Sequence, residues 1–479
     1  MIPLPQYKGR TVAVMGLGRS GIATARALAA SGAEVWAWDD DEASRQRAKT
    51  DGVAIVDLMA CDWRVPKAMV LSPGIPFHYP APHPVAALAR SAGCAVIGDI
   101  ELLGKAKGPA RLCGISGTNG KSTTTSLIGH ILKDAGIAAE VGGNLGTPAL
   151  ALAPLGGDGV YVIEVSSFQL DLTASIAFDV AVLLNISPDH LYRHGGLDGY
   201  IAAKRRIFRN QTTNHVAVIG VDDDYGRAIH EEMRASNGPR ALPISGERRV
   251  AGGVYALDGV LYDDTDGANA AVLKMAEAPR LPGTHNWQNA AAAYAAARAL
   301  GLPRDIVLRG LRTFPGLAHR QELVATIGGV RYINDSKATN ADAAAKALAC
   351  YRNIYWIAGG RPKEGGIRTL TPWFPRIVHA FLIGEAEADF ADTLKGHVPL
   401  TRCGNLAVAL TKASDMAHAH GRADSVVMLS PACASFDQWE NFEARGDGFK
   451  KLVAALPGAR SNDPENTHVS GGRAARGRA

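Results

Sequence analysis

The 479-residue sequence lacks several features that would place it in a class at once. No apolar run is long enough to span a membrane, and the N-terminal residues MIPLPQYKGR contain no signal-like apolar segment. A large charge excess is also missing, since 51 Lys and Arg nearly balance 46 Asp and Glu to give a net charge of +5. An excess this small does not indicate a nucleic-acid partner. We therefore expect a cytoplasmic protein with no membrane span and no nucleic-acid partner, and we expect it to be a monomer.

Cysteines are few and scattered, with no CxxC pair and no spacing typical of metal ligands among the six. In a chain of this length, the pattern indicates reduced thiols in a cytosolic protein. Apolar residues make up 47% of the chain and charged residues 20%, which excludes intrinsic disorder for most of it. The absence of a short-period repeat speaks against solenoids and propellers.

Strand-like and helical segments alternate along the chain in three blocks, which predicts an α/β fold with largely parallel sheets. The length also suggests about three domains. We expect their boundaries at 1–104, 105–316 and 317–459. Gly and Asp punctuation in 249–278 suggests inserted hairpins. Residues 460–479 are rich in Gly, Arg and Asn without periodicity, and we expect a disordered tail there.

A glycine-rich turn opens the first block. The segment Gly16-Leu-Gly-Arg-Ser-Gly21 directly follows the strand-like TVAVM, and Asp39 ends the next strand. Glycines at this spacing permit a tight turn and a close approach of the backbone to a diphosphate at a helix N-terminus. This is a dinucleotide-binding fingerprint, but it equally suits a doubly wound fold that uses the glycines only for packing. The residues alone leave both interpretations open.

A second glycine-rich turn, Gly114-Ile-Ser-Gly-Thr-Asn-Gly-Lys-Ser-Thr123, lies between a strand and a helix of the second block. It resembles a phosphate-binding loop, in which Lys121 reaches the β- and γ-phosphates and a hydroxyl of Ser122 or Thr123 binds Mg²⁺. The strict pattern requires glycine where Ile115 stands, so the first glycine is displaced to Gly114. A chance Gly-Lys-Ser turn would not explain the strand, turn and helix together. We therefore predict phosphate binding.

Three more segments of the second block carry charged residues that suit a phosphate site. Glu164 ends the apolar strand VYVIEV, where it is either a magnesium ligand beside the phosphate loop or an exposed strand-end acid. Asp189 and His190 follow the next strand and form a second possible ligand pair, although a loop histidine commonly faces solvent. Lys204 precedes two arginines in an amphipathic helix, which suits a solvated face or a phosphate contact.

Two turns of the third block also join a strand to a helix. The segment NDSKATN, residues 334–340, has a composition and position that suit an anion. The segment LSPACASFDQWENFEARG, residues 429–446, contains Cys433. The sequence positions no histidine as a partner for this thiol, so we interpret Cys433 as a packing residue and not as a nucleophile.

Together these motifs resemble the Mur ligases, the ATP-dependent amino-acid ligases of peptidoglycan synthesis. GTNGKST, EVSSFQLD, SPDH, the AAK ending at Lys204 and HNWQNAAAA belong to the family as a whole, and the similarity covers residues 8–458. NDSKATN and SPACASFDQWENFEARG are more specific to the branch that adds D-glutamate, whereas the DNPR motif of sister ligases is missing. The displaced glycine of the phosphate loop is also how this family writes its motif.

The resemblance implies a Rossmann-like N-terminal domain for a UDP-linked substrate, a central P-loop ATPase-like domain and a Rossmann-like C-terminal domain for the amino acid. It implies that the γ-phosphoryl group of ATP is transferred to the carboxylate of UDP-N-acetylmuramoyl-L-alanine. The amine of D-glutamate then displaces phosphate from the acyl phosphate. ATP and two Mg²⁺ ions are the expected cofactors, because a carboxylate approaches a triphosphate only when cations offset their repulsion.

The resemblance also assigns site residues by position. It implies that the UDP-linked substrate binds at Gly18, Arg19, Ser20, Gly21, Ser72, Pro73 and Gly74. It implies that ATP binds at Gly117, Thr118, Asn119, Gly120, Lys121, Ser122, Thr123, Asn286, Asn289, Arg320, Asp335 and Lys337, the last three by domain closure. It implies that D-glutamate binds at Thr339, Lys363, Ser435 and Phe442. Catalytic roles fall to Lys121, Asn144, His190 and Lys204, and metal binding to Ser122, Glu164, His190 and, if it is carbamylated, Lys204.

Three alternatives stay open at this point. A nicotinamide-dependent oxidoreductase would use the turn at 16–21, but it would leave the phosphate loop and the third block unexplained. A non-catalytic nucleotide-binding regulator would keep the fold, although the charged residues at the predicted site are intact. A sister ligase for another amino acid, or an enzyme similar to folylpolyglutamate synthase, would share the central domain, and the two third-block turns speak against it.

Overall fold

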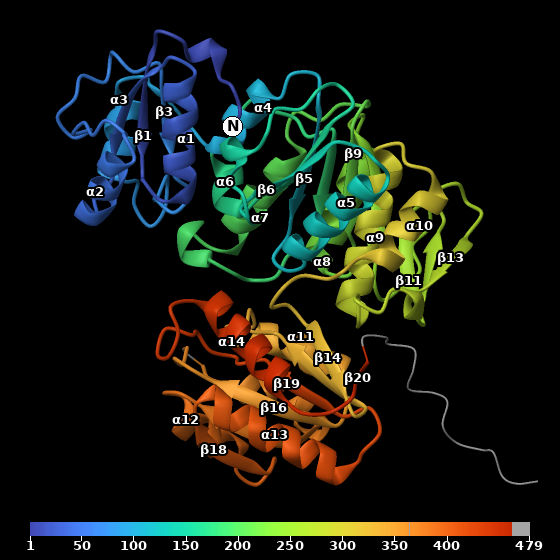
Figure 1. Ribbon diagram of the computed structural model, residues 1–479. Coiled ribbons are helices and arrows are strands. Elements are labelled where there is room, and N and C mark those ends of the chain that lie inside the picture. Colours follow the sequence, from blue (N-terminus) through green and yellow to red (C-terminus); the bar gives the residue numbers. More distant parts are fainter. Residues whose placement is uncertain (364, 462–479) are drawn as a thin grey trace, which may run out of the picture. The chain divides into compact units, whose positions relative to one another are not determined.

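The computed structural model describes residues 1–363 and 365–461, which form three β-sheets with helices packed on them (Figure 1). The chain divides into two compact units. Unit 1 comprises residues 1–278 and 284–314, and unit 2 comprises residues 279–283 and the chain from 315 onward. The predicted α/β class is confirmed. The three-domain division stays a prediction, because the first two sheets belong to the same unit.

The first sheet of unit 1 is parallel, in the order β2-β1-β3-β4. Its strands and the helices that alternate with them are β1 Thr11–Met15, α1 Arg19–Ala30, β2 Glu34–Trp38, α2 Glu42–Thr50, β3 Ala68–Leu71, α3 Pro84–Ser91, β4 Ala95–Ile97 and α4 Asp99–Ala106. The sequence pattern predicted this alternation. Helix α4 runs past residue 104, where we placed the first boundary, and the missing side chain of Gly104 leaves room for Ile176 of the next region.

The second sheet of unit 1 has nine strands in the order β13-β12-β11-β10-β9-β8-β5-β7-β6. Its strands are β5 Arg111–Ser116, β6 Ala139–Gly143, β7 Val160–Glu164, β8 Val180–Leu183, β9 Val216–Gly220, β10 Arg240–Ser245, β11 Val254–Leu257, β12 Val260–Asp263 and β13 Ala270–Lys274. Its helices are α5 Lys121–Asp134, α6 Ser167–Asp171, α7 Leu197–Arg205, α8 Asp224–Ala235, α9 Thr284–Ala299 and α10 Arg304–Thr313. Strands β11, β12 and β13 pair antiparallel, which confirms the hairpins expected in 249–278.

Strand β5 lies between β7 and β8, so the carboxyl ends of all three parallel strands meet at one edge of the sheet. The five residues of β7 are fully covered by neighbours, which explains why VYVIE is an almost continuous apolar run. One hydrophobic cluster continues from this sheet into the first sheet and contains Val12, Leu103 and Ile163. That shared core explains why the first two sheets form a single unit.

The sheet of unit 2 has the order β18-β17-β16-β19-β15-β14-β20. Its elements are β14 Glu322–Ile327, β15 Val330–Asn334, α11 Ala341–Cys350, β16 Ile354–Gly359, β17 Ile377–Ile383, α12 Glu387–Leu394, β18 Leu400–Gly404, α13 Leu406–His420, β19 Val426–Leu429, α14 Phe442–Ala455 and β20 Arg460–Ser461. Strand β20 pairs antiparallel with β14, so the first two residues of the expected disordered tail are part of the sheet. The rest of that tail, 462–479, lies outside the described residues.

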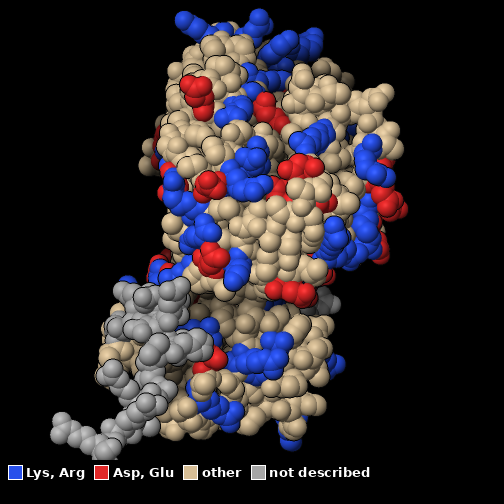
Figure 2. Space-filling view, turned by 90° about the vertical axis from the view of Figure 1, so that its right-hand side faces the viewer, with Lys and Arg blue, Asp and Glu red and all other residues tan. Residues whose placement is uncertain are grey.

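Lys and Arg residues are interspersed with Asp and Glu on the face that Figure 2 shows, in keeping with the small net charge. Among the residues that the structure describes, no helix is both long and apolar enough to cross a membrane.

Candidate active site

The phosphate loop connects the buried strand β5 to helix α5. Gly117 has φ 150° and Gly120 has φ 84°, in the range that side chains other than glycine rarely adopt. A Cβ atom on Gly120 would lie 2.2 Å from Oδ1 of Asn289, so the side-chain-free backbone is what admits this asparagine. Helix α5 begins at Lys121, and Ser122 and Thr123 are buried in its first turn. The helix N-terminus and its free N–H groups face the anion that we predicted here.

Two lysines converge on one carbonyl group of this loop. Nζ of Lys121 donates to the carbonyl oxygens of Gly117 at 2.7 Å and Thr118 at 2.8 Å, and Nζ of Lys204 donates to the same Gly117 oxygen at 2.8 Å. Lys204 is only 2% exposed, on helix α7. Burial, followed by the charge of Lys121, holds the pKa of the Lys204 ammonium well below its ordinary value. The sequence suggested a solvated lysine, but the structure buries it beside the phosphate loop.

A buried carboxylate stands at the end of the neighbouring strand. Glu164 ends β7 and is 2% exposed, so the alternative of an exposed strand-end acid is wrong. Its Oε1 accepts a hydrogen bond from Nδ2 of Asn144 at 2.7 Å, while its buried Oε2 has no partner among the described residues. An unpaired buried carboxylate oxygen is costly, which points to a cation as its partner. The structure thereby brings Asn144 and Glu164 together.

Other side chains fix the shape of the loop, and the sequence did not single them out. The hydroxyl of Thr118 lies 3.0 Å from that of Tyr200 and accepts from the backbone N–H of Ser187 at 3.0 Å. The amide of Asn185 accepts from the N–H of Asn119 at 2.8 Å and donates to its carbonyl oxygen at 3.2 Å. Thr118 and Asn119 are thus held by the segment that follows β8. A polar Asn at the end of an apolar strand was the available signal for Asn185.

Helix α9 closes the other side of the loop. Asn286 and Asn289 are both buried, and Nδ2 of Asn289 donates to Oδ1 of Asn286 at 3.0 Å. Oδ1 of Asn289 accepts from the hydroxyl of Thr124 at 3.3 Å, which ties α9 to α5. The two asparagines predicted for ATP therefore lie together against the phosphate loop.

His190 lies on the loop after β8 with its backbone in the left-handed region at φ 52°. Its imidazole is about half exposed, 3.6 Å from the carboxylate of Asp189 and with its ring centroid 5.1 Å from that of Phe168. Within the described residues, no group of three or more His, Cys, Asp and Glu side chains is arranged to hold a metal ion. Mg²⁺ at such a site commonly takes one or two protein oxygens and completes its shell with water and phosphate.

The turn at 16–21 packs tightly on the first sheet. A Cβ atom on Gly21 would lie 1.7 Å from the carbonyl oxygen of Gly16, so glycine is required there. The hydroxyl of Ser72 donates to the same oxygen at 2.9 Å, which brings the second predicted UDP segment, Ser72, Pro73 and Gly74, beside the first. Gly18 precedes the first turn of α1, where Arg19, Ser20 and Gly21 lie. Asp39 accepts from the N–H of Leu17 at 2.6 Å, so it fixes the turn itself.

In unit 2, the turn after β15 holds three of the predicted residues. Asp335 is 4% exposed, and its carboxylate accepts from the hydroxyl of Ser430 at 2.8 Å and from the N–H of Gln321 at 3.1 Å. Burial raises the pKa of Asp335 to about 7. Nζ of Lys337 lies 5.4 Å from the ring centroid of Phe442, and the N–H of Thr339 donates to the carbonyl oxygen of Lys337 at 2.9 Å. Arg320 lies in the segment that precedes β14.

The sequence did not identify Arg445, which joins two turns of unit 2. It is 1% exposed, and its guanidinium donates to the hydroxyl and carbonyl oxygens of Ser336 at 3.0 and 2.9 Å and to the carbonyl oxygens of Cys433 at 3.1 Å and Ala434 at 3.3 Å. Burial lowers its pKa to about 10. Cys433 is buried against it with a thiol pKa raised to about 12, which supports the interpretation as a packing residue.

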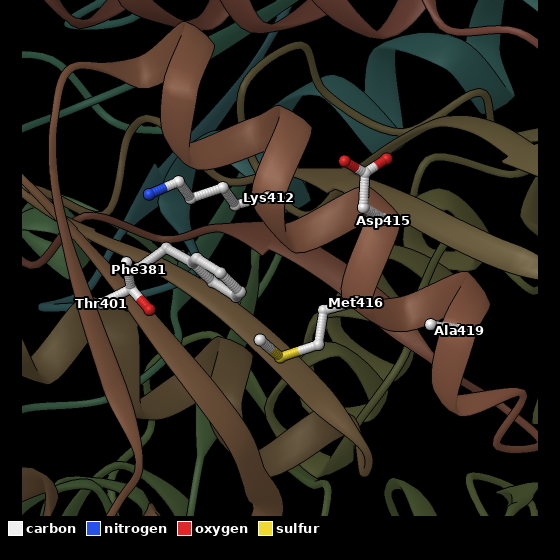
Figure 3. A pocket seen from close by; sticks show the side chains of 6 residues that line it. All are labelled: Phe381, Thr401, Lys412, Asp415, Met416 and Ala419. Carbon is white, nitrogen blue, oxygen red and sulfur yellow. The ribbon is translucent and has the colours of Figure 1, made fainter.

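Two predicted D-glutamate residues differ in their exposure. Ser435 directly follows this junction and is buried, whereas Lys363 is exposed beside residue 364, which lies outside the described residues. A separate hollow of about 410 Å³ lies where Lys412, Asp415, Met416 and Ala419 of α13 face Phe381 and Thr401 on neighbouring strands (Figure 3). It contains none of the predicted site residues.

Comparison with known proteins agrees with this geometry. The family model of the Mur ligase middle domain matches residues 115–297. A UDP-N-acetylmuramoylalanine–D-glutamate ligase from Rhodospirillum rubrum is 53% identical over 96% of this chain and 98% of its own length. A ligase of the same name from Phenylobacterium zucineum is 52% identical over 95% of this chain and 98% of its own length.

Solved structures resemble the fold at much lower identity. The UDP-N-acetylmuramate–alanine ligase of Thermotoga maritima matches with a TM-score of 0.57 at 17% identity, over 93% of this chain and 99% of its own. A pseudomurein peptide ligase from Methanothermus fervidus matches with a TM-score of 0.52 at 18% identity, over the same shares of the two chains. At this identity, the likeness shows the fold alone. Because relatives more than 50% identical cover nearly the whole chain, this protein belongs to the Mur ligase family, in the branch of UDP-N-acetylmuramoylalanine–D-glutamate ligases.

Proposed function

We propose that this protein is an ATP-dependent ligase that joins D-glutamate to UDP-N-acetylmuramoyl-L-alanine, with ADP and phosphate as the other products. The near full-length identity to ligases of that name supports the substrate pair. The reaction belongs to the synthesis of peptidoglycan precursors, which would place the enzyme in the cytoplasm. The observation that carries the proposal is the convergence of Lys121 and Lys204 on the Gly117 carbonyl of a phosphate loop.

The phosphate loop would bind the triphosphate of ATP. Backbone N–H groups at the start of α5 and the ammonium of Lys121 offset its negative charge. Lys121 would exchange its present carbonyl partners for phosphate oxygens, because a charged oxygen is a stronger acceptor than a neutral one. These cations also reduce the repulsion between the triphosphate and the incoming substrate carboxylate. The loop therefore supports phosphoryl transfer to a carboxylate.

The residues present fit a magnesium ion. Oε2 of Glu164 is buried without a partner among the described residues, and Ser122 supplies a hydroxyl in the first turn of α5. Hard oxygen ligands of this kind suit Mg²⁺. When bound, the ion would neutralise charge that develops on the transferred phosphoryl group. Asn144 would hold the carboxylate of Glu164 in place through its 2.7 Å hydrogen bond. We propose two ions in all, with His190 contributing to the second.

The environment of Lys204 suits carbamylation. Burial and the charge of Lys121 favour the neutral amine, as the lowered pKa of Lys204 indicates. A neutral amine attacks the carbon of CO₂, and the new N–C bond gives a carbamate with release of one proton. The product exchanges a repelled cation for a carboxylate-like anion beside Lys121. That anion would form an ion pair with Lys121 and provide a further oxygen ligand for Mg²⁺.

Unit 2 supplies the remaining residues that we propose for the substrates. Arg320, Asp335 and Lys337 are proposed for ATP, and Thr339, Lys363, Ser435 and Phe442 for D-glutamate. The exposed ammonium of Lys363 would pair with a carboxylate of the amino acid. Arg445 would hold the Ser336 and Cys433 turns in register for them.

The proposal is tested by measuring ADP release from ATP, Mg²⁺ and UDP-N-acetylmuramoyl-L-alanine with D-glutamate, L-glutamate, L-lysine or diaminopimelate in separate reactions. We expect turnover with D-glutamate alone. Turnover that requires a different amino acid would contradict the proposed substrate, and ATP binding without turnover in any of the reactions would contradict the proposed activity.

A further inference from the structure

A short segment on the edge of the candidate site grips one aromatic ring from several sides. The ring is that of Phe168 on α6, and the segment is 190–194, which begins with His190. The guanidinium carbon of Arg193 lies 4.7 Å from the centroid of the Phe168 ring, and the imidazole of His194 stacks on that ring at 5.4 Å with an interplanar angle of 23°. The ring of His190 contacts the same side chain at 5.1 Å. We call this arrangement the Phe168 clasp.

Polar bonds anchor the clasp on the central sheet. His194 is 5% exposed; its Nε2 lies 3.0 Å from the hydroxyl of Ser167, and its Nδ1 lies 3.3 Å from the carboxylate of Asp171. Ser167 and Asp171 are the first and last residues of α6, so one imidazole spans the whole helix. This helix follows Glu164 by three residues. Any displacement of the clasp would therefore be transmitted to the end of β7.

The other end of the clasp reaches the first sheet. Nη1 of Arg193 donates to the carbonyl oxygen of Gly74 at 2.7 Å, and Nη2 donates to those of Pro73 at 3.3 Å and Ile75 at 3.0 Å. Next along the chain, Gly195 adopts φ 68°, and a Cβ atom there would lie 2.7 Å from the ring of Tyr79. Two adjacent residues of this segment thus hold the 73–79 stretch, of which Pro73 and Gly74 are proposed to bind the UDP-linked substrate.

We infer that Arg193 and His194 are positioning residues that couple the binding of the UDP-linked substrate to the binding of the nucleotide. This inference rests on the proposed function. Three carbonyl groups of the 73–75 turn share one guanidinium, so substrate that orders this turn also orders Arg193. Arg193 and His194 enclose Phe168, so the order extends to His190 and to α6 beside Glu164. By linkage, each ligand then raises the affinity for the other by the same factor.

The test measures that factor directly. The Kd of MgADP is determined by calorimetry without and with saturating UDP-N-acetylmuramoyl-L-alanine, for the wild type, Arg193→Met and His194→Phe. We expect the substrate to tighten MgADP binding to the wild type by at least about fivefold, the lower end of typical coupling factors. Arg193→Met should reduce the factor to less than about twofold. His194→Phe keeps the ring but loses both polar partners, and it should give an intermediate factor.

Arg298→Met is the matched control, because Nη1 of Arg298 donates to the carbonyl oxygen of Leu302 in the same unit, at the end of α9 remote from the clasp. It should keep the wild-type factor. Arg193→Lys and thermal unfolding show whether a variant has simply lost stability, since a structural role alone would lower Tm without changing the ratio of the two Kd values. An unchanged factor in Arg193→Met, or no coupling in a wild type that turns over D-glutamate, overturns the inference alone. A wild type that binds no UDP-linked substrate overturns the proposed function as well.

Discussion

Lys121 and Lys204 donate to the same carbonyl oxygen, that of Gly117, at 2.7 and 2.8 Å. Two ammonium groups at this separation repel each other, and the more deeply buried of them, Lys204, has the lowered pKa. The pair forms at the edge of the sheet where β5 and β7 end. Three of our predictions concern this pair and the buried carboxylate next to it.

Replacing Lys121 by Ala should lower kcat by at least about 10³-fold, because it removes the cation that we place on the transferred phosphoryl group. The variant should fold, since Lys121 bonds only to loop carbonyl oxygens that water could satisfy. ADP release under saturating substrates checks the prediction. Lys133→Ala, at the exposed end of the same helix, should turn over like the wild type. Near-normal turnover of Lys121→Ala would contradict the proposed role.

Lys204 should take up CO₂, and turnover should fall when bicarbonate and CO₂ are removed from the buffer. Because the neutral amine is the reactive form, uptake should rise with pH up to the lowered pKa of Lys204 and level off above it. A carbamate resonance in the ¹³C NMR spectrum after addition of labelled bicarbonate checks this. The signal should be absent from Lys204→Ala and present in Lys133→Ala. A wild type without the signal, but with full activity in CO₂-free buffer, would contradict carbamylation.

Arg445→Met should raise the KM for D-glutamate by more than about tenfold and the KM for ATP by much less. The substitution leaves the carbonyl oxygens of Ser336 and Cys433 without their buried donor, at a cost of about 1–3 kcal/mol per unsatisfied group. Arg376→Met is the control, because Arg376 donates to the carbonyl oxygens of Ala349 and Tyr351 on another side of unit 2. Equal rises in both KM values would show that Arg445 stabilises the unit without positioning the amino acid.

Asp335 should make unit 2 less stable as pH rises. Its folded-state pKa, about 7, lies above the value of about 3.9 for an unfolded aspartate, so the folded state binds more protons between these two pH values. Stability from this group is therefore complete below about pH 4 and is lost as pH rises through 7. Between pH 5 and 8, Tm should fall by several degrees more in the wild type than in Asp335→Asn. Asp342→Asn, an exposed residue of α11, should behave like the wild type, and identical pH profiles for all three proteins would refute the prediction.

Local sequence determines much of this structure. The loop from Gly117 to Gly120 has its conformation because glycines permit φ values that other residues avoid, and the apolar run before Glu164 forms a strand because both faces are buried. Such features are readable without tertiary information. The hairpins of 249–278 and the alternation of strand and helix were predictable for the same reason.

Contacts between distant segments were not predictable from pattern alone. Lys204 looked like one of three cations on a helix face, and only its burial against the phosphate loop distinguishes it. His194 and Arg193 carried no motif, because their partners lie on α6 and in the 73–75 turn. Arg445 stood within a recognised motif, yet its burial depends on how two turns of unit 2 fold together.

The central claim is that the substrate carboxylate is phosphorylated and then attacked by the D-glutamate amine. It is tested most directly with UDP-N-acetylmuramoyl-L-alanine labelled with ¹⁸O in its terminal carboxylate, in the presence of ATP, Mg²⁺ and D-glutamate. Mass spectrometry of the released phosphate should find one ¹⁸O atom per turnover, because an acyl phosphate leaves with one carboxylate oxygen. Unlabelled phosphate, or label found in AMP, would contradict the account.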